Sequence, residues 1–349
     1  MKVFVAGATG VVGTRLVPLL ISAGHEVIAS TRTPAKVRAL TASGAEAVVV
    51  DALDAGAVKA AVVSAQPDVI VHQMTALAGM GSLKRFDDEF ALTNRLRTEG
   101  TEYLLAAARE AGVRRFIAQS FTGWSNERIG TRVKNEDDPL DPHPPVTMSK
   151  TLDAIRTLEA TVTGTTGLTG IALRYGYLYG PGTSLGIGGD IVEAVRRRRF
   201  PIVGSGAGVW SFVHVDDAAA AARVAIERGP SGVYNIVDDE PAEIALWLPE
   251  LARAVGGRPP IHVPTWVGRL AIGAAGVSMM TQTRGSSNAK AKRVLGWQPR
   301  YASWRDGFRH GLGADVVART ERDRAGARAS TSEGDAFARP GQRGIRTSV

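Results

Sequence analysis

The chain has 349 residues, of which 44% are hydrophobic and none is cysteine. The lack of cysteine excludes disulfides, thiolate metal sites and cysteine nucleophiles, and it is typical of a protein in the reducing cytoplasm. The six histidines show no metal-ligand spacing, so we expect no bound metal. The length allows two domains, or one domain with an extension.

The formal net charge of +8 raises the question of a nucleic-acid partner. The tail from Arg319 to Val349 holds seven arginines and four acidic residues, so it supplies three of the eight excess charges. The dense basic cluster in the rest of the chain, Arg196 to Arg199, lies at a predicted helix end, where cations complement the helix dipole. We therefore interpret the charge as a solvated surface and expect no nucleic-acid partner.

Two apolar stretches bear on membrane association. The first, in MKVFVAGATG, reaches glycine within seven residues and is too short for the core of a signal peptide. The second, from Trp266 to Met280, falls short of the ~20 apolar residues that cross a bilayer, and it contains Arg269. We expect no membrane partner and a cytoplasmic location.

Short apolar runs alternate with helical patterns in the first half of the chain. The predicted strands are KVFVA, HEVIAS, EAVVV, DVIVH and RRFIAQS, and residues 87–111 predict a long helix before the last of them. Such alternation is typical of a parallel sheet with helices on both faces. The predicted fold class is therefore α/β, a doubly wound parallel sheet of the Rossmann type, with a crevice at the carboxyl ends of its strands.

The regular alternation ends near residue 175. We interpret residues 1–175 as the sheet domain and residues 176–315 as a smaller α/β lobe for a small-molecule substrate, parts of which return to the sheet. This lobe includes the segments SFVHVDD, GVYNIVDDE and AKRVLGWQP. Residues 316–349 are rich in Arg, Ala, Gly, Ser and Thr, a composition that predicts a disordered basic tail.

A glycine-rich loop directly follows the first predicted strand. Its glycines, spaced GxxGxxG, permit a tight turn and a close approach of the backbone, so that the next helix can point its amino terminus at a pyrophosphate. The alternative is a purely structural turn. In this context between strand and helix we predict that the loop binds a dinucleotide through Gly7, Ala8, Thr9, Gly10, Val11, Val12 and Gly13.

The end of the second predicted strand bears on the choice of cofactor. An NAD site usually has an acidic residue there for the ribose 2′-hydroxyl, whereas this chain has Ser30, Thr31 and Arg32. The guanidinium of Arg32 suits a 2′-phosphate, so we predict NADP, with NAD the alternative if Arg32 is only a surface residue. Asp51 is placed to accept from the adenine amino group, or else to cap the helix that follows.

A set of ordered motifs resembles the extended or atypical short-chain dehydrogenases/reductases of the NAD-dependent epimerase/dehydratase type, over about residues 2–310. The motifs are GATGVVG, Asp51, Asn94, TMSK at 147–150, LRYGYLYGPG at 173–182, WSFVHVDD at 210–217 and KRVLGWQP at 292–299. The resemblance implies a Tyr-x-x-x-Lys pair, in which the tyrosine is the acid or base and the lysine bonds the nicotinamide ribose. Lys150 matches the lysine, and Val146 stands at the tyrosine position.

The resemblance also implies a catalytic hydroxyl at the end of the fifth predicted strand. Ser120 or Thr122 could fill this role, although Ser120 could equally do no more than bond backbone. Tyr177 replaces the asparagine that usually faces the substrate, so it is the first candidate for a relocated acid, with substrate wall as the alternative. His143 is the second candidate, and Lys150 with a bound water is the third.

The substitution at Val146, together with Phe121, Trp124 and Met148, makes the expected pocket apolar. We predict an NADP-dependent reductase for a carbonyl or an activated double bond of a small, fairly apolar molecule. One alternative is a cofactor-binding sensor that has lost catalysis. Another is an epimerase or dehydratase for sugar nucleotides, for which Arg284 is a candidate pyrophosphate ligand. The resemblance further implies a homodimer formed through the long helices.

Overall fold

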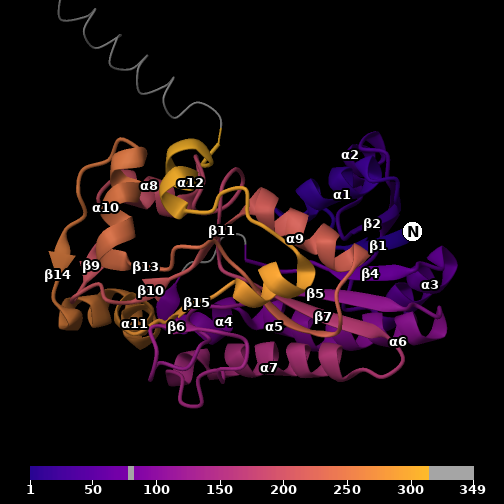
Figure 1. The fold of residues 1–349 in the computed structure, drawn as a ribbon, viewed down its shortest axis with the longest axis horizontal. Helices are drawn as coiled ribbons and strands as arrows, with labels where there is room; N and C mark the ends of the chain where they lie inside the picture. Colours follow the sequence, from indigo (N-terminus) through magenta and orange to yellow (C-terminus); the bar gives the residue numbers. More distant parts are fainter. Residues whose placement is uncertain (78–81, 314–349) are drawn as a thin grey trace, which may run out of the picture.

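The computed structural model describes residues 1–77 and 82–313. Figure 1 shows a central sheet covered by helices on both faces and a smaller lobe beyond the carboxyl ends of the strands. The sequence interpretation of residues 316–349 as a disordered tail lies outside the described residues.

The central sheet has seven strands in the order β12-β7-β5-β4-β1-β2-β3. All neighbouring strands are parallel, which confirms the predicted fold class and its five amino-terminal strands. The chain moves outward from β1 to β3 and then returns to β4 on the other side of β1, so the cofactor crevice is expected between β1 and β4. The strands are β1 Lys2–Ala6, β2 Glu26–Thr31, β3 Glu46–Val49, β4 Val69–His72, β5 Arg115–Phe121, β7 Thr169–Tyr175 and β12 Gly232–Ile236.

Alternating side chains of the strands build one core on each face of the sheet. Val3 and Val5 of β1 pack with α1 and α9, whereas Phe4 and Ala6 pack with α3, α6 and α7. Because both faces are covered, the middle residues of the central strands β1, β4 and β5 are apolar and buried. The helices that cover the sheet are α1 Gly13–Ser22, α3 Ala55–Ala65, α6 Thr101–Glu110, α7 Ser149–Gly164 and α9 Val215–Glu227; the short η1 Pro34–Lys36 and α2 Val37–Ala42 lie between β2 and β3.

The helix predicted over residues 87–111 is present but interrupted. It consists of α4 Phe86–Glu89, α5 Ala91–Arg95, a π-helical turn Leu96–Gly100 and α6, and it follows the short 3₁₀ turn Leu83–Arg85. A π-helical turn changes the direction of the side chains around it, and such turns are frequent at functional sites. This turn contacts α7 and the carboxyl end of β4.

The smaller lobe has its own core around Phe212, Trp247, Trp304 and Phe308. Its helices are α8 Asp190–Arg196, α10 Ile244–Ala254, α11 Thr265–Thr281 and α12 Trp304–His310. Its short strands are β8 Tyr177–Tyr179, β9 Ile202–Val203, β10 Val209–Trp210, β11 Phe212–His214, β13 Ala242–Glu243 and β14 His262–Val263.

The segment GVYNIVDDE, which sequence reasoning assigned to the smaller lobe, returns to the main sheet. Its residues Gly232–Ile236 form β12 and pair in parallel with β7, from Gly232 opposite Ile171 to Ile236 opposite Tyr175. Helix α9, just before β12, also covers the main sheet. The lobe is therefore interrupted in sequence by one helix and one strand of the sheet domain. The segment AKRVLGWQP, also assigned to the lobe, packs Ala291, Leu295 and Trp297 into the core of the sheet domain instead, and residues 291–295 form a π-helical turn.

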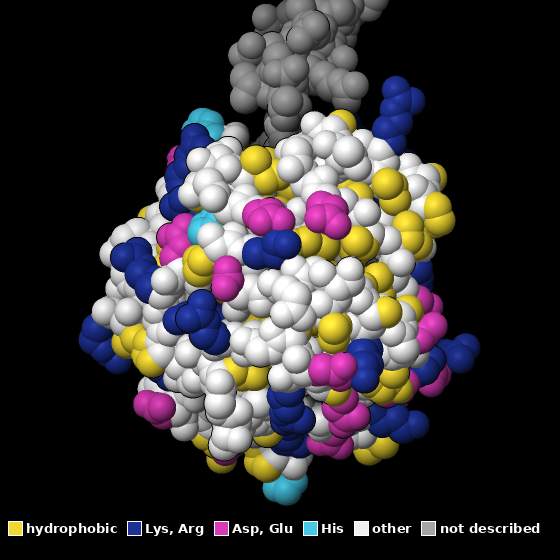
Figure 2. Space-filling view, turned by 90° about the vertical axis from the view of Figure 1, so that its right-hand side faces the viewer, with side chains coloured by type: hydrophobic (Ala, Val, Ile, Leu, Met, Phe, Trp, Pro, Cys, Tyr) yellow, Lys and Arg dark blue, Asp and Glu magenta, His cyan; other side chains and the backbone are white. Residues whose placement is uncertain are grey.

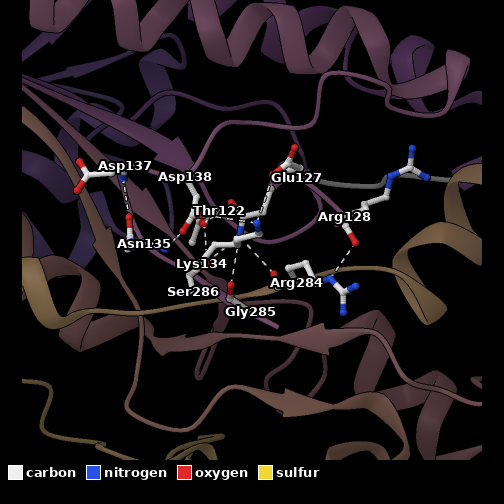
Figure 3. Close-up of polar contacts among 11 residues, drawn as sticks. Thr122, Glu127, Arg128, Lys134, Asn135, Asp137, Asp138, Arg284, Gly285 and Ser286 are labelled. Atoms are coloured by element: carbon white, nitrogen blue, oxygen red, sulfur yellow. Dashed lines mark hydrogen bonds and ion pairs between the residues drawn. The ribbon is translucent and has the colours of Figure 1, made fainter. Parts of the chain in front are cut away.

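A polar network joins the end of β5 to the smaller lobe (Figure 3). The Thr122 hydroxyl lies 2.6 Å from the Ser286 hydroxyl, and the Asn126 amide donates to the same Ser286 oxygen at 2.9 Å. Strand β6, Val133–Lys134, pairs in parallel with β15, Gly285–Ser286. The Lys134 ammonium, on a side chain that is 3% exposed, lies between carboxylates of Glu127 at 3.4 Å and Asp138 at 3.5 Å. These contacts hold the lobe at a fixed position over the sheet edge.

The surface carries charges of both signs. Figure 2 shows Lys and Arg side chains beside Asp and Glu side chains over the face at the right of Figure 1. Among residues 1–77 and 82–313, no helix combines the length and the apolar character that a membrane crossing requires.

The first prediction concerns His72, which is buried at the end of β4. Its Nε2 donates to the Leu96 carbonyl oxygen at 3.0 Å and its Nδ1 accepts from the Met74 N–H at 3.1 Å, and the second bond needs the neutral ring. Burial, aided by the charge of Arg97, lowers the pKa of His72 from 6.5 to about 4. The unfolded chain therefore takes up a proton that the folded protein excludes between these two pH values.

We expect this histidine to contribute about 3 kcal/mol to the loss of stability as the pH falls from 7 to 4. Denaturant unfolding of the wild-type protein and of His72→Gln at several pH values measures this, because glutamine does not titrate. The wild-type protein should lose more stability than the variant over this range. Equal losses in the two proteins would contradict the assignment.

Candidate cofactor and substrate site

The loop Gly7–Gly13 lies where β1 ends and α1 begins, and its glycines are required by close backbone contacts. Gly7 has a φ of +90°, and a Cβ there would lie 2.8 Å from the Gln73 carbonyl group. A Cβ on Gly13 would lie 2.3 Å from the Gly7 oxygen, and the Gly10 N–H closes the turn on that same oxygen at 3.0 Å. The loop can therefore hold a ligand against bare backbone.

The amino terminus of α1 has the electrostatics of an anion site. The first turn of α1 contains no acidic residue. Within residues 1–77 and 82–313 we find no acceptor for the backbone N–H groups of Val11 and Val12. Unpaired amides and the positive end of the helix dipole together attract a phosphate, so this loop fits the pyrophosphate of a dinucleotide.

Arg32 and Asp51 follow the second and third strands and are both exposed. Arg32 makes no hydrogen bond or ion pair with the described residues, so its guanidinium is free to meet a ligand. Asp51 accepts from the Leu53 N–H at 3.0 Å, but the cap of α3 is Asp54, which accepts from the Ala57 N–H at 3.0 Å. Capping of α3 therefore does not explain Asp51.

Lys150 lies in the first turn of α7, and its side chain is exposed. Val146 is 87% exposed and Lys150 is exposed too, and the side of the helix that they share stays exposed along its length. The inward side carries Thr151, Ile155 and Glu159, four residues apart. Among the described residues Lys150 makes no side-chain hydrogen bond to Ser120, which bonds Glu159 instead. The role of Lys150 in cofactor binding stays a prediction.

Thr151 is fully buried at the start of α7, and its hydroxyl is engaged on both sides. It donates to an Asp87 carboxylate oxygen at 2.7 Å and accepts from the Asn94 amide at 3.0 Å. Asp87 also accepts the backbone N–H groups of Lys150 and Thr151, at 3.1 and 2.9 Å. Asp87 therefore acts as the cap of α7 and fixes this end of the helix against α4.

Ser120, a predicted catalytic residue, is buried against α7. Its hydroxyl donates to the Glu159 carboxylate at 2.6 Å, and so the backbone bond that sequence reasoning considered is replaced by a bond to an acid. Arg174 holds the same carboxylate with two bonds, at 2.7 and 2.6 Å. Ser120 is thus part of a buried ion-pair cluster at the carboxyl end of β5.

Arg97 also lies in this buried region, and sequence reasoning missed it. The residue is 5% exposed, and its Nη1 has no hydrogen-bond partner. Its guanidinium lies 6.0 Å from the Phe90 ring centroid. Burial lowers the pKa of Arg97 to about 10, although the charge of Glu159 opposes this change. Helical spacing could have identified it. Arg97 precedes the buried Leu104 by seven residues, or about two turns, so both lie on the apolar side of the predicted helix.

Tyr177, the first candidate for a relocated acid, lies in an aromatic stack. Its ring stacks on Trp210 at 3.7 Å and meets the edge of Phe121 at 5.4 Å. The phenol oxygen is enclosed without a hydrogen-bond partner, and burial raises its pKa, so the group stays protonated at neutral pH. Its geometry suits a packed wall, with one unsatisfied hydroxyl.

His143 and Arg284 lie together in a different place. Both line a cavity of about 390 Å³ between the loop after β5 and the end of α11, with Arg128 and Asp141. Neither Ser120, Lys150 nor Tyr177 lines this cavity. The second acid candidate is therefore separated from the cluster at β5, and Arg284 from the glycine loop.

Comparison with known proteins identifies the family of the chain. The model of the NAD dependent epimerase/dehydratase family matches residues 3–237. The chain belongs to this family. A 3-diazoavenalumate denitrifying reductase from Streptomyces is 44% identical over 312 residues, which cover 88% of this chain and 99% of the relative. A ketoreductase of Stigmatella aurantiaca, acting on a farnesyl dihydroquinoline oxide, is 28% identical over 73% of this chain and 74% of its own length.

Solved structures of the family share the fold. The UDP-glucose 4-epimerase of Thermotoga maritima superimposes with a TM-score of 0.71 at 23% identity, over 89% of this chain and 97% of the epimerase. The human epimerase family protein SDR39U1, solved with NADPH, gives 0.70 at 20% identity, over 89% and 99%. Family membership, the glycine loop and the relatives named as reductases support an NAD(P)-dependent oxidoreductase.

The close contact at Gly13 generates the second prediction. Because a Cβ there would lie 2.3 Å from the Gly7 oxygen, Gly13→Ala should displace the loop and weaken NADPH binding at least about tenfold, measured by calorimetry. Gly164→Ala is the matched control, since a Cβ at this exposed end of α7 meets nothing within 4 Å. Unchanged affinity in Gly13→Ala would show that the loop does not hold the cofactor.

Proposed function

We propose that this protein is an NADPH-dependent reductase that delivers hydride to an electrophilic group on a small aromatic molecule. The leading candidate for this group is a diazo group. The observation that carries the proposal is the inward face of α7. The inward pair spaced by four residues is Thr151 and Ile155, while Val146 is 87% exposed. Because Val146 stands at the position that the sequence resemblance gives to the tyrosine, we expect no phenol in the role of the family's acid. The reaction should then be one that needs no such acid.

The chain's own residues divide the work of holding the cofactor. The glycine loop and the amino terminus of α1 bind the pyrophosphate, Arg32 pairs with the 2′-phosphate, and Asp51 accepts from the adenine amino group. NADPH, when bound, supplies hydride, and hydride that replaces a diazonium group releases N₂ with atoms and charge in balance and no proton required.

Carbonyl reduction places a different demand on the protein. It produces an alkoxide, and a positioned acid for that oxygen contributes about 10² to 10⁴ in rate. Loss of N₂ leaves no oxyanion to protonate, so a site without that tyrosine is not penalised in this reaction. The relative that is 44% identical is named for such a denitrifying reduction of a diazo compound.

The aromatic wall has a matching role. Phe121, Tyr177 and Trp210 present packed rings beside the carboxyl ends of β5 and β7. An apolar wall excludes water, and water is the nucleophile that would otherwise consume a diazonium group before hydride reached it. The same wall gives no ion pair for a sugar nucleotide, which disfavours an epimerase activity.

A second candidate is reduction of a ketone with Tyr177 as the acid. The unpartnered phenol oxygen of Tyr177 favours it, because a buried hydroxyl without a partner is costly unless a ligand accepts its proton. One relative is named a ketoreductase. The two candidates differ in whether the phenol is needed.

The third prediction tests the choice of cofactor. Arg32→Ala should raise the Kd for NADPH about tenfold or more and leave that for NADH within about twofold, because only NADPH carries the phosphate that this guanidinium would meet. Titration of cofactor fluorescence measures both constants. Arg109→Ala, which removes another exposed arginine from α6, is the control for net charge. A loss of equal size for both cofactors would mean that Arg32 does not recognise the 2′-phosphate.

The fourth prediction separates the two reactions. With an aryl diazonium salt and NADPH, Tyr177→Phe should release N₂ within about threefold of the wild-type rate, because no proton is donated. With a panel of aryl ketones, any wild-type turnover should fall by about 10²-fold in the same variant if the phenol is the acid. Gas evolution and NADPH absorbance follow the two reactions.

Two results would contradict this account. Loss of N₂ release in Tyr177→Phe with unchanged cofactor affinity would make the phenol essential and favour the ketone reaction. Tight NADPH binding without turnover of either substrate class would instead favour a cofactor-binding sensor.

A further inference from the structure

A buried cation at the carboxyl edge of the sheet has no bonded partner among residues 1–77 and 82–313. Arg97 is 5% exposed, its Nη1 is enclosed without an acceptor, and its guanidinium donates no hydrogen bond to the described residues. Burying an unpaired charge costs several kcal/mol. Arg97 lies at the carboxyl end of the sheet, where ligands of this fold bind. An unpaired charge in that place is therefore a candidate to pair with a bound ligand.

The charges around Arg97 do not cancel. Glu159 is the nearby acid, but Arg174 already pairs with both of its oxygens, at 2.7 and 2.6 Å, and Ser120 donates to one of them. His72, which bonds the Leu96 carbonyl group next to Arg97, is neutral at pH 7 because burial lowers its pKa to about 4. The cluster of Arg97, Arg174 and Glu159 therefore has one surplus positive charge.

The position of Arg97 distinguishes between the anions that could approach it. The π-helical turn that carries it contacts the end of β4 and α7, and its neighbour Glu159 contacts β5 through Ser120. The two anionic parts of NADPH belong on the other side of the crevice, at the glycine loop after β1 and at Arg32 after β2. The surplus charge thus lies on the side of the sheet where substrate meets the nicotinamide.

Aromatic rings continue from this cation. Arg97 lies over Phe90, which stacks on Phe86 at 4.4 Å, and Phe86 meets Trp124 at 5.1 Å. Trp124 stacks on Phe121 at 5.7 Å, and Phe121 leads to the Tyr177 and Trp210 stack. A connected series of rings with a cation at one end suits a flat aromatic molecule that carries an anionic group.

We propose that Arg97 binds the carboxylate of an aromatic acid substrate and so selects aromatic acids over their neutral analogues. This inference rests on the proposed function for the location of the substrate, and it adds the substrate class and the residue that recognises it. A guanidinium fits a carboxylate with two parallel bonds, and in a site that excludes water such a pair is strong. The bound acid would also remove the surplus charge of the cluster.

The test compares an acid with its amide. The full-length protein with bound NADP⁺ is titrated with trans-cinnamate and with trans-cinnamamide, which differ in charge at one end. The wild-type protein should bind cinnamate at least about tenfold more tightly. Arg97→Gln should bring the two affinities to within about twofold, and Arg97→Lys should keep most of the preference because it keeps the charge.

Controls separate recognition from folding. Arg95→Gln makes the same change two residues earlier, at an exposed arginine that pairs with Glu99 at 2.8 Å, and should retain the preference. Arg97→Met should unfold at or above the wild-type temperature, since removing an unpaired buried charge removes its cost. A preserved melting temperature together with a lost preference supports the proposal.

Three results would overturn the proposal. One is equal affinity of the wild-type protein for the two ligands, or binding of neither. Another is a preference that survives in Arg97→Gln. The third is an Arg97→Gln variant that binds NADPH more weakly but keeps the wild-type ratio of affinities for cinnamate and cinnamamide. That result would mean that Arg97 binds the cofactor rather than the substrate. None of these measurements needs turnover. Their results can therefore be interpreted even if the protein does not reduce diazo compounds.

Discussion

The ion pair between Glu159 and Arg174 fixes the rotation of α7, and the chemistry of the site depends on that rotation. Both groups are buried, and breaking such a pair costs about 3–5 kcal/mol, so the helix must keep Glu159 toward β7. Counting back by helical turns then places Ile155 and Thr151 inward. The same rotation leaves Val146 and Lys150 in solvent. The inward face thus carries Thr151 and Ile155 at the four-residue spacing, and the loss of the usual catalytic pair is part of our proposal.

The polar groups that remain near this face are of a different kind. Thr151 bonds Asp87 and Asn94, Ser120 bonds Glu159, and the guanidinium of Arg97 has no bonded partner in the part of the chain that the structure describes. In our proposal this site binds an anion and excludes water, while the hydroxyls of Thr151 and Ser120 are engaged as donors to carboxylates. That combination suits a reaction in which hydride alone is transferred and the leaving group departs as a neutral gas.

The sequence predicted well those features that depend on near neighbours in the chain. The five amino-terminal strands, the glycine loop and the long helix follow from local periodicity and from the turn residues between them. The motif TMSK leads into the start of α7, but its spacing could not reveal the rotation of that helix. The rotation depends on Arg174, which lies on strand β7, after the helix in the chain. Likewise, β12 returns to the sheet because of its pairing with β7, and local pattern does not encode such a distant partner.

The most direct measurement follows the origin of the hydrogen that replaces the diazo group. An aryl diazonium acid is reduced once with NADPH deuterated at nicotinamide C4 in ordinary water, and once with unlabelled NADPH in heavy water. Mass spectrometry of the product then reports the label at the carbon that lost N₂. Our account predicts one deuterium from the labelled cofactor and none from heavy water. Deuterium from heavy water at that carbon would contradict direct hydride delivery, and with it the claim that this site needs no acid.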